Sequence, residues 1–317
     1  MPDNRNRAFA GAAPTVLAAV AAVALAFPAA AAGQATRVEQ PAFDTPIPDY
    51  YQPSWQVFLD LKKKANGGAR HGFADLPDWT GVWSHGPRHT NFDPKQGPND
   101  PLPANVELTP KYRAMYEKKL ADVKRGIEWD PLSYCLPAGY PRWFTEPFLR
   151  EFIVRPEEVW WINEQQSEVR RIYTDGRGHV PEDEAFPLWE GDSIGFWDGD
   201  TLVVHTIRVK AGQYQRSQPD FSDKLSTVEK IRKIDPDTIQ DDVTVWDPEG
   251  LVKPWHVVNE YYRVATPHVR IDQWSCEENN NVVKDQTGTT NFILPGEPGY
   301  KDPNHLERQA GVNLDAN

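Results

Sequence analysis

The sequence predicts a mainly β protein, an antiparallel up-and-down β-barrel with an extended arm and an N-terminal helical segment. Two observations support this fold class. From about residue 148 onward, apolar side chains recur at every second position in short runs, the periodicity of half-buried strands. Turn signals separate the runs, and the strongest is Asp198-Gly199 between SIGFW and TLVVHTI. Evenly spaced strands joined by short turns are typical of a barrel or of a strongly curved sandwich.

The strands can be assigned from these runs and their turns. A first strand is expected at 77–83, in PDWTGVW. The later strands are expected at 149–156, 157–165, 167–175, 192–198, 200–209, 224–234, 237–247, 253–264 and 268–276.

The clearest helix is predicted over 109–125. Thr109 can cap its N-terminus, Pro110 suits its first turn, and Gly126 can end it. A shorter helix is expected at 55–64, after a proline-rich segment.

These elements suggest how the chain is divided. We expect an N-terminal arm over 36–78, a single barrel domain over 79–281 and a C-terminal tail over 282–317. Residues 1–35 combine two early arginines, an alanine-rich apolar run and small residues, which is typical of a secretory signal peptide. No later segment reaches transmembrane length, so we expect a periplasmic or secreted protein without a membrane span.

Charge and cysteine content narrow the partners and the compartment. The formal net charge of -12 argues against a nucleic-acid partner, because phosphate binding needs clustered lysines and arginines. The two cysteines, Cys135 and Cys276, are expected to form one disulfide in an oxidising compartment.

Several motifs occur together between residues 79 and 281: CLPAGYPR, RRIYTDGRGH, WEGDSIGFWDGDTLVV and CEENN. In this combination the chain resembles a largely uncharacterised family of exported bacterial proteins. The resemblance implies a calycin-like (lipocalin-like) barrel and no particular activity. It also implies an aspartate in many relatives at the position of His205, which makes this histidine a candidate for a specialised role.

The first candidate site lies on the expected inner faces of the strands. His205 lies inside TLVVHTI, a strand that is apolar on both faces, and Glu229 shares the apolar row of its own strand. Arg171 and Tyr173 share a row with Val169. An imidazole, a carboxylate, a guanidinium and a phenol meeting in one apolar cavity would suit acid–base catalysis. Alternatively, His205 is a core residue, and Glu229 and Arg171 form a structural ion pair.

A second group of candidates lies near strand ends. We expect Asp192 to be catalytic, and His179, Arg142 and Trp197 to contact substrate at or near the barrel mouth. Turn formation by DGRGH and a surface salt bridge of Arg142 are the structural alternatives.

The sequence favours chemistry without a cofactor. It contains no glycine-rich phosphate loop after a strand, no G-x-S-x-G elbow and no dinucleotide fingerprint. His85 and His89 have a spacing that can chelate a metal, but Gly86-Pro87 breaks the helix that would align them, so no metal is expected.

Three functions remain open at this stage. The favoured hypothesis is a cofactor-free lyase or isomerase that uses histidine and carboxylate acid–base chemistry on a small apolar or aromatic molecule. The alternative is a protein that binds a hydrophobic small molecule without catalysis, as the twelve tryptophans would allow. The third is an envelope scaffold. The oligomeric state is not predicted.

Overall fold

The computed structural model describes most of the chain between residues 43 and 298. The described residues are 43–85, 102, 105–127, 130–215, 218–273, 282–284, 290–293 and 297–298. The predicted signal peptide, Cys276, His89 and most of the predicted tail lie outside them.

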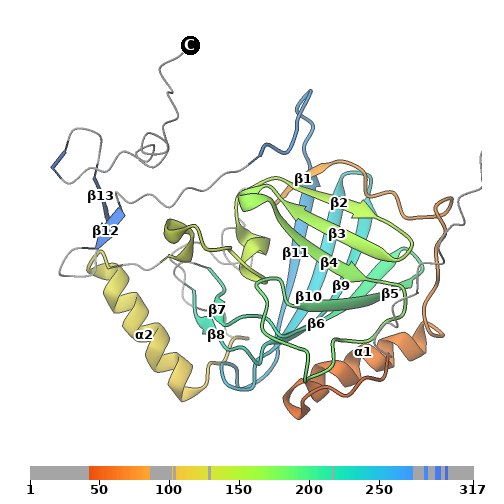
Figure 1. Cartoon of the computed structure of the whole chain (residues 1–317), viewed down its shortest axis with the longest axis horizontal. Coiled ribbons are helices and arrows are strands. Elements are labelled where there is room, and N and C mark those ends of the chain that lie inside the picture. Colours follow the sequence, from red (N-terminus) through yellow and green to blue (C-terminus); the bar gives the residue numbers. More distant parts are fainter. Residues whose placement is uncertain are drawn as a thin grey trace, which may run out of the picture. The chain divides into compact units, whose positions relative to one another are not determined.

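The main feature is a closed barrel of nine strands, which confirms the predicted barrel (Figure 1). Around the barrel, each strand neighbours the next along the chain, and a small β7–β8 hairpin is inserted between β6 and β9. The barrel strands are β1 (Val82–His85), β2 (Arg150–Val154), β3 (Glu158–Asn163), β4 (Glu168–Tyr173), β5 (Asp192–Asp198), β6 (Thr201–Ile207), β9 (Ser226–Asp235), β10 (Thr238–Trp246) and β11 (Trp255–Arg263). The remaining strands are β7 (Gly212–Gln213), β8 (Asp220–Phe221), β12 (Val282–Lys284) and β13 (Thr290–Phe292).

One pair of neighbours departs from the expected antiparallel arrangement. β4 and β5 run parallel, whereas the other neighbouring barrel strands pair antiparallel. The barrel is therefore mixed. The cause is the connection over 174–191, because a parallel neighbour requires the chain to return to the end from which β4 started.

The last predicted strand, at 268–276, is also corrected. Its described part, 268–273, is not a strand. β11 already pairs with β10 on one edge and with β1 on the other, so no edge remains for a following segment. β1 itself begins at Val82, later than expected.

Two helices flank the barrel (Figure 1). α1 (Gln52–Lys64) follows a 3-10 turn (Asp49–Tyr51) and packs against β6 and β9. α2 (Pro110–Lys124) packs against β8. Thr109 takes the predicted N-cap position, but its hydroxyl donates to the backbone oxygen of Glu249 at 2.6 Å and makes no side-chain cap.

Three shorter 3-10 segments complete the regular structure. They are η2 (Pro131–Tyr134), η3 (Arg142–Thr145) and η4 (Gln165–Ser167). Cys135 follows η2 with a left-handed φ of 54°. Because Cys276 lies outside the described residues, the disulfide stays a prediction.

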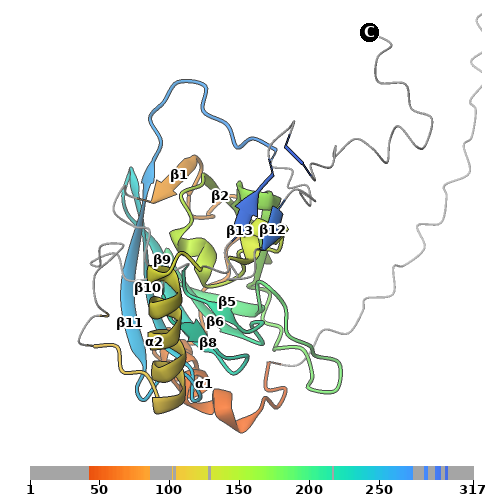
Figure 2. The same ribbon diagram turned by 90° about the vertical axis from the view of Figure 1, so that its left-hand side faces the viewer.

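Two apolar cores lie on opposite faces of the sheet. The larger contains Trp83, Trp161 and Val204 on the inner faces of the barrel strands and extends to Tyr112 of α2 and Phe221 of β8. The smaller lies between α1 and the outer face of β5 and β6, and contains Phe58 and Val203. Figure 2 shows α1 below the strands and α2 along one side. β6 is thus covered on both faces, as its two apolar rows predict.

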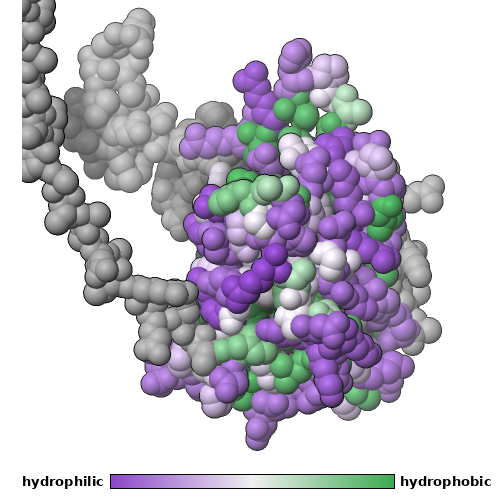
Figure 3. Space-filling model, turned by 90° about the vertical axis from the view of Figure 1, so that its right-hand side faces the viewer, coloured by the Kyte–Doolittle hydropathy of each residue, from purple (hydrophilic) through white to green (hydrophobic). Residues whose placement is uncertain are grey.

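The outer surface on the right-hand side of Figure 1 is mainly hydrophilic, with small apolar patches (Figure 3). Among the described residues, no helix is both long enough and apolar enough to cross a bilayer.

Candidate active site

A buried ion pair lies inside the barrel. The Arg170 guanidinium donates to both carboxylate oxygens of Glu229, from Nη1 to Oε2 at 2.8 Å and from Nη2 to Oε1 at 2.6 Å. Both side chains are fully buried. Arg170 also donates to the hydroxyls of Ser193 at 3.2 Å and Thr206 at 2.8 Å. Charge and hydrogen-bonding capacity are therefore largely satisfied within this cluster.

Tyr140 extends the cluster toward the 138–142 loop. Its hydroxyl donates to Glu229 Oε1 at 2.9 Å and lies 2.5 Å from Thr227 Oγ1. The Arg170 guanidinium lies 4.2 Å from the centre of the Tyr140 ring, within cation–π range. Burial, followed by the Glu229 charge, raises the pKa of the phenol well above its usual value, so Tyr140 stays protonated.

Asp241 is a buried carboxyl group that, unlike Glu229, makes no hydrogen bond within the described part of the chain. It lies on β10 between Ile239 and Val243 in the buried row, and it is fully buried. Neither carboxyl oxygen has a hydrogen-bond partner among the described residues. Burial, followed by the nearby Glu229 charge, raises the pKa of Asp241 well above its usual value. The buried environment of Asp241 therefore favours its protonated, neutral form.

A second pair of carboxyl groups lies close to Arg170. Glu168 shares the buried row of β4 with Arg170, and burial raises its pKa to about 7. Glu190 precedes β5, and burial followed by the Glu168 charge raises its pKa well above the usual value. Two carboxyls that interact in this way share protons near neutral pH, one giving a proton up more easily than the other.

Aromatic rings surround these groups. The Tyr261 ring lies 5.3 Å from the Trp161 ring, edge to face, and the Tyr261 hydroxyl and the Trp161 Nε1 have no partner among the described residues. Phe152 and Phe144 also pack on Trp161, at 4.7 and 5.2 Å between ring centres. The interior therefore combines apolar walls with unpaired donors, which is the usual composition of a small-molecule site.

A second polar network lies on the outer face of β6, under α1. His205 Nδ1 lies 2.8 Å from His179 Nε2, and His205 Nε2 lies 2.9 Å from Ser54 Oγ on α1. At the other end, His179 Nδ1 lies 3.0 Å from Asp192 Oδ2. Four side chains thus form one chain from helix to barrel, and we call it the histidine chain.

Charged and polar groups surround the Asp192 end of the histidine chain. Burial alone would raise the pKa of Asp192, but His179, the Val180 N–H and Arg208 together lower it below its usual value. The Asp192 carboxylate can only accept, and His179 Nδ1 faces it at ion-pair distance. His205 contacts His179 through Nδ1 and Ser54 through Nε2, and the Ser54 hydroxyl also donates to the backbone oxygen of Tyr51 or to Ser226 Oγ. Burial, followed by repulsion from His179, lowers the pKa of His205 well below its usual value, which keeps it neutral.

The structure separates the residues that the sequence analysis grouped together. His205, His179 and Asp192 meet outside the barrel, whereas Glu229 lies inside it with its carboxylate on Arg170. Val203, His205 and Ile207 face α1, and Val204 faces the barrel interior, so neighbouring positions on β6 serve different networks.

The other predicted site residues lie apart from both networks or at the edge of the barrel. The Arg171 side chain is half exposed, pairs with Glu158 at 3.4 Å and stacks on Trp160. Tyr173 is half-buried and lies under the Arg177 guanidinium. Neither residue contacts Glu229, because β4 presents Arg170 rather than Arg171 to the interior.

Trp197 and Arg142 are both buried. The Trp197 ring packs against Trp79 at 5.5 Å in the barrel core. Arg142 pairs with Asp130 at 2.9 Å and with Glu146 at 2.6 Å, so the expected surface salt bridge is instead a buried one.

Sequence reasoning missed Arg170, Asp241, Glu168, Glu190 and Tyr140. For Asp241 a signal existed, because it interrupts the apolar row of Ile239 and Val243 in a predicted strand. Tyr140 and Glu190 come from loops, and no pattern in the sequence places a loop residue inside a barrel.

Metal and cofactor sites can be checked for the described residues only. Within that part of the chain, no group of three or more histidine, cysteine, aspartate or glutamate side chains has the arrangement of a metal site. His85 lies at the end of β1, and its predicted partner His89 lies outside the described residues.

Comparison with known proteins adds no relative. No protein-family model, curated protein or solved structure matches this chain. The functional argument therefore depends on the geometry of its own residues.

Proposed function

We propose that the protein is a cofactor-free enzyme of the lyase or isomerase type that acts on a small apolar or aromatic molecule inside the barrel. One observation carries the proposal. The Asp241 carboxyl, which has no hydrogen-bond partner among the described residues and a raised pKa, lies in the same aromatic-lined interior as the Arg170–Glu229 ion pair. Environments that drive neighbouring carboxyl groups toward different protonation states are characteristic of acid–base sites.

The carboxyl groups suit different roles. Glu168, with a pKa of about 7, can accept a proton at neutral pH, while Asp241 holds a proton that it can donate. The Tyr261 hydroxyl can donate a hydrogen bond to a substrate oxygen as charge develops there. Arg170 and Glu229 act as positioning residues, because most of their hydrogen bonds are already made within the protein.

In this proposal the histidine chain has a different task from the one first expected. His205 is fully buried beneath Trp55 and Phe58, with ring centres 5.2 and 5.6 Å away. His205 fixes α1 to the outer face of the barrel, and the inner carboxyl groups carry out the acid–base chemistry.

We propose further that the chain is exported and belongs to the calycin-like family that its motifs resemble. The alanine-rich segment within 1–35 and the closed barrel support this assignment. A hydrophobic-ligand carrier without catalysis is the competing function, since it would use the same aromatic interior.

The test is to incubate the purified protein with a panel of small aromatic and terpenoid molecules and to analyse the mixtures by mass spectrometry. We expect a product that Asp241→Asn and Glu168→Gln no longer form. Asp242→Asn and Glu158→Gln are matched controls, because these carboxyls lie on the outer face of the same or the adjacent strand. Ligand that is retained unchanged by wild type and variants would replace the enzyme with a carrier.

A further inference from the structure

A cavity of about 580 Å³ lies outside the barrel, between α2 and the β7–β8 hairpin. Its volume falls in the range of small-molecule sites. Tyr112, Trp189 and Phe221 contribute aromatic surface, and Met115, Val123 and Ile127 contribute aliphatic surface. None of these side chains belongs to the histidine chain or to the buried group formed by Arg170, Glu229, Asp241, Glu168 and Glu190.

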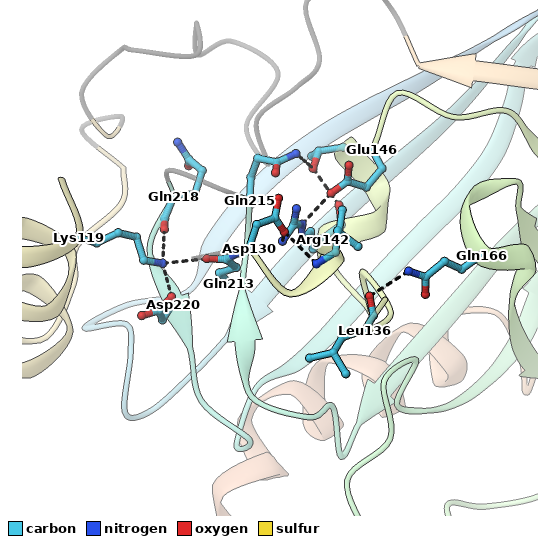
Figure 4. Close-up of polar contacts among 12 residues, drawn as sticks. Lys119, Asp130, Leu136, Arg142, Glu146, Gln166, Gln213, Gln215, Gln218 and Asp220 are labelled. Carbon is cyan, nitrogen blue, oxygen red and sulfur yellow. Dashed lines mark hydrogen bonds and ion pairs between the residues drawn. The ribbon is translucent and has the colours of Figure 1, made fainter. Parts of the chain in front are cut away.

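Every charged side chain that lines this cavity has a partner of opposite charge. Lys118 pairs with Asp122 at 2.6 Å, Lys119 pairs with Asp220, and the buried Arg142 pairs with Asp130 and Glu146. Figure 4 shows the last two groups on opposite sides of the β7–β8 hairpin. The cavity therefore offers no unpaired cation to an anionic ligand, and a charged ligand would be desolvated without compensation.

The polar surface of the cavity has a defined orientation at Gln213. Lys119 Nζ, which can only donate, lies 3.2 Å from the Gln213 side chain and so fixes Oε1 on its own side. The amide Nε2 is then directed away from Lys119. It is buried and has no hydrogen-bond partner among the described residues. A ligand with a neutral oxygen acceptor would match this donor after a small side-chain adjustment.

From the size, the aromatic lining and the balanced charges, we propose that this cavity binds an uncharged, largely apolar small molecule that carries a carbonyl or ether oxygen. The lining contains none of the side chains of the proposed acid–base site, so the ligand of this cavity does not depend on the proposed catalytic activity.

The proposal is tested with two fluorescent naphthalene dyes and the purified full chain. One is the neutral ketone 6-propionyl-2-dimethylaminonaphthalene, and the other is the anion 8-anilinonaphthalene-1-sulfonate. We expect the neutral dye to bind at least about tenfold more tightly, because the anion finds no unpaired cation. The proposal would be overturned if the anion bound as tightly as the ketone. It would also be overturned if neither dye bound, as expected when another segment fills the cavity.

Two variants test where the neutral dye binds and whether the paired charges of the cavity exclude the anion. Ala211→Trp fills the cavity from an exposed position and should weaken binding of the neutral dye at least about tenfold, whereas Ala74→Trp, in an exposed loop, should not. Asp220→Asn removes the carboxylate partner of Lys119 and should raise the affinity for the anion severalfold. Binding of the neutral dye that is unchanged in Ala211→Trp lies elsewhere and contradicts the proposal. An Asp220→Asn variant with an unchanged preference for the neutral dye over the anion also contradicts it. Thermal unfolding confirms that each variant folds.

Discussion

The two faces of β6 support polar networks of opposite character. On the outer face, Asp192, His179, His205 and Ser54 form a chain of contacts at 2.8–3.0 Å. On the inner face, the Arg170–Glu229 pair is satisfied, but the Asp241 carboxyl nearby has no partner in the described part of the chain.

This difference separates a structural network from a functional candidate. A buried polar chain that is complete fixes one arrangement of its elements, here α1 on the barrel. A buried carboxyl without partners costs free energy, and proteins tolerate such costs mainly where a site needs them. The inner face is therefore the better candidate for chemistry, although a histidine lies on the outer one.

The largest effect is expected from breaking the inner ion pair. Arg170→Met leaves Glu229 buried without its cation, which should lower the free energy of unfolding by about 3–5 kcal/mol. Arg171→Met, at the half-exposed neighbouring position, should change it by less than about 0.5 kcal/mol. Urea unfolding measures both, and similar values for the two variants would show that the inner pair is not a stabilising anchor.

Breaking the outer chain should cost less. His205→Leu keeps the apolar volume but leaves Ser54 and His179 without their shared partner, so we expect a loss of about 1–3 kcal/mol. The control is His256→Leu on the exposed face of β11, which should lie within about 0.5 kcal/mol of wild type. A His205→Leu protein as stable as wild type would remove the locking role of the chain.

The inner carboxyl groups predict a pH dependence. The pKa of Asp241 is raised in the folded state, so between its ordinary value near 4 and that raised value the folded protein holds more protons than the unfolded chain. Stability from this group is then lost as pH rises, by up to about 1.4 kcal/mol per pH unit. The stability of Asp241→Asn relative to wild type should therefore increase as the pH rises above about 4, as measured by urea unfolding at a series of pH values. A constant difference would mean that Asp241 is not held neutral.

The histidine chain predicts the opposite pH dependence of stability, over a narrower pH range. The pKa of His205 is lowered in the folded state, so below about 6.5 the unfolded chain takes up a proton that the folded protein does not. The contribution of His205 to the free energy of unfolding is complete above pH 6.5 and decreases as pH falls. The stability difference between wild type and His205→Leu should therefore shrink between pH 6.5 and 5. Unfolding curves that keep the same difference over that window would contradict the assignment of a neutral histidine.

The sequence predicted more of the barrel than of the site. Strand periodicity placed Glu229 on an inner face, because it shares a row with Ile231 and Leu225. The same rule chose the wrong row of β4. Val169 and Tyr173 made the row of Arg171 look apolar, yet Val169 is exposed and Arg170 is buried with Glu229. A pattern rule assumes an apolar interior, and this interior is charged.

Contacts between distant loops lie beyond any local pattern. His179 contacts both His205 and Asp192 because the segment between β4 and β5 passes over the outer face of the barrel. Ser54 arrives from α1, more than a hundred residues away. Residue types in the sequence singled out His205, His179 and Asp192 one by one, but tertiary folding alone determines that they touch.

The parallel pair β4–β5 also bears on how the barrel moves. Its ladder contains only two residue pairs, Ile172 with Ser193 and Tyr173 with Ile194, whereas the β9–β10 ladder runs almost the whole length of both strands. Short ladders are the first to open in native-state fluctuations. The β1–β2 ladder is equally short, so the barrel is closed by two brief ladders. Amide hydrogens around Ile194 should therefore exchange with solvent sooner than those around Val243.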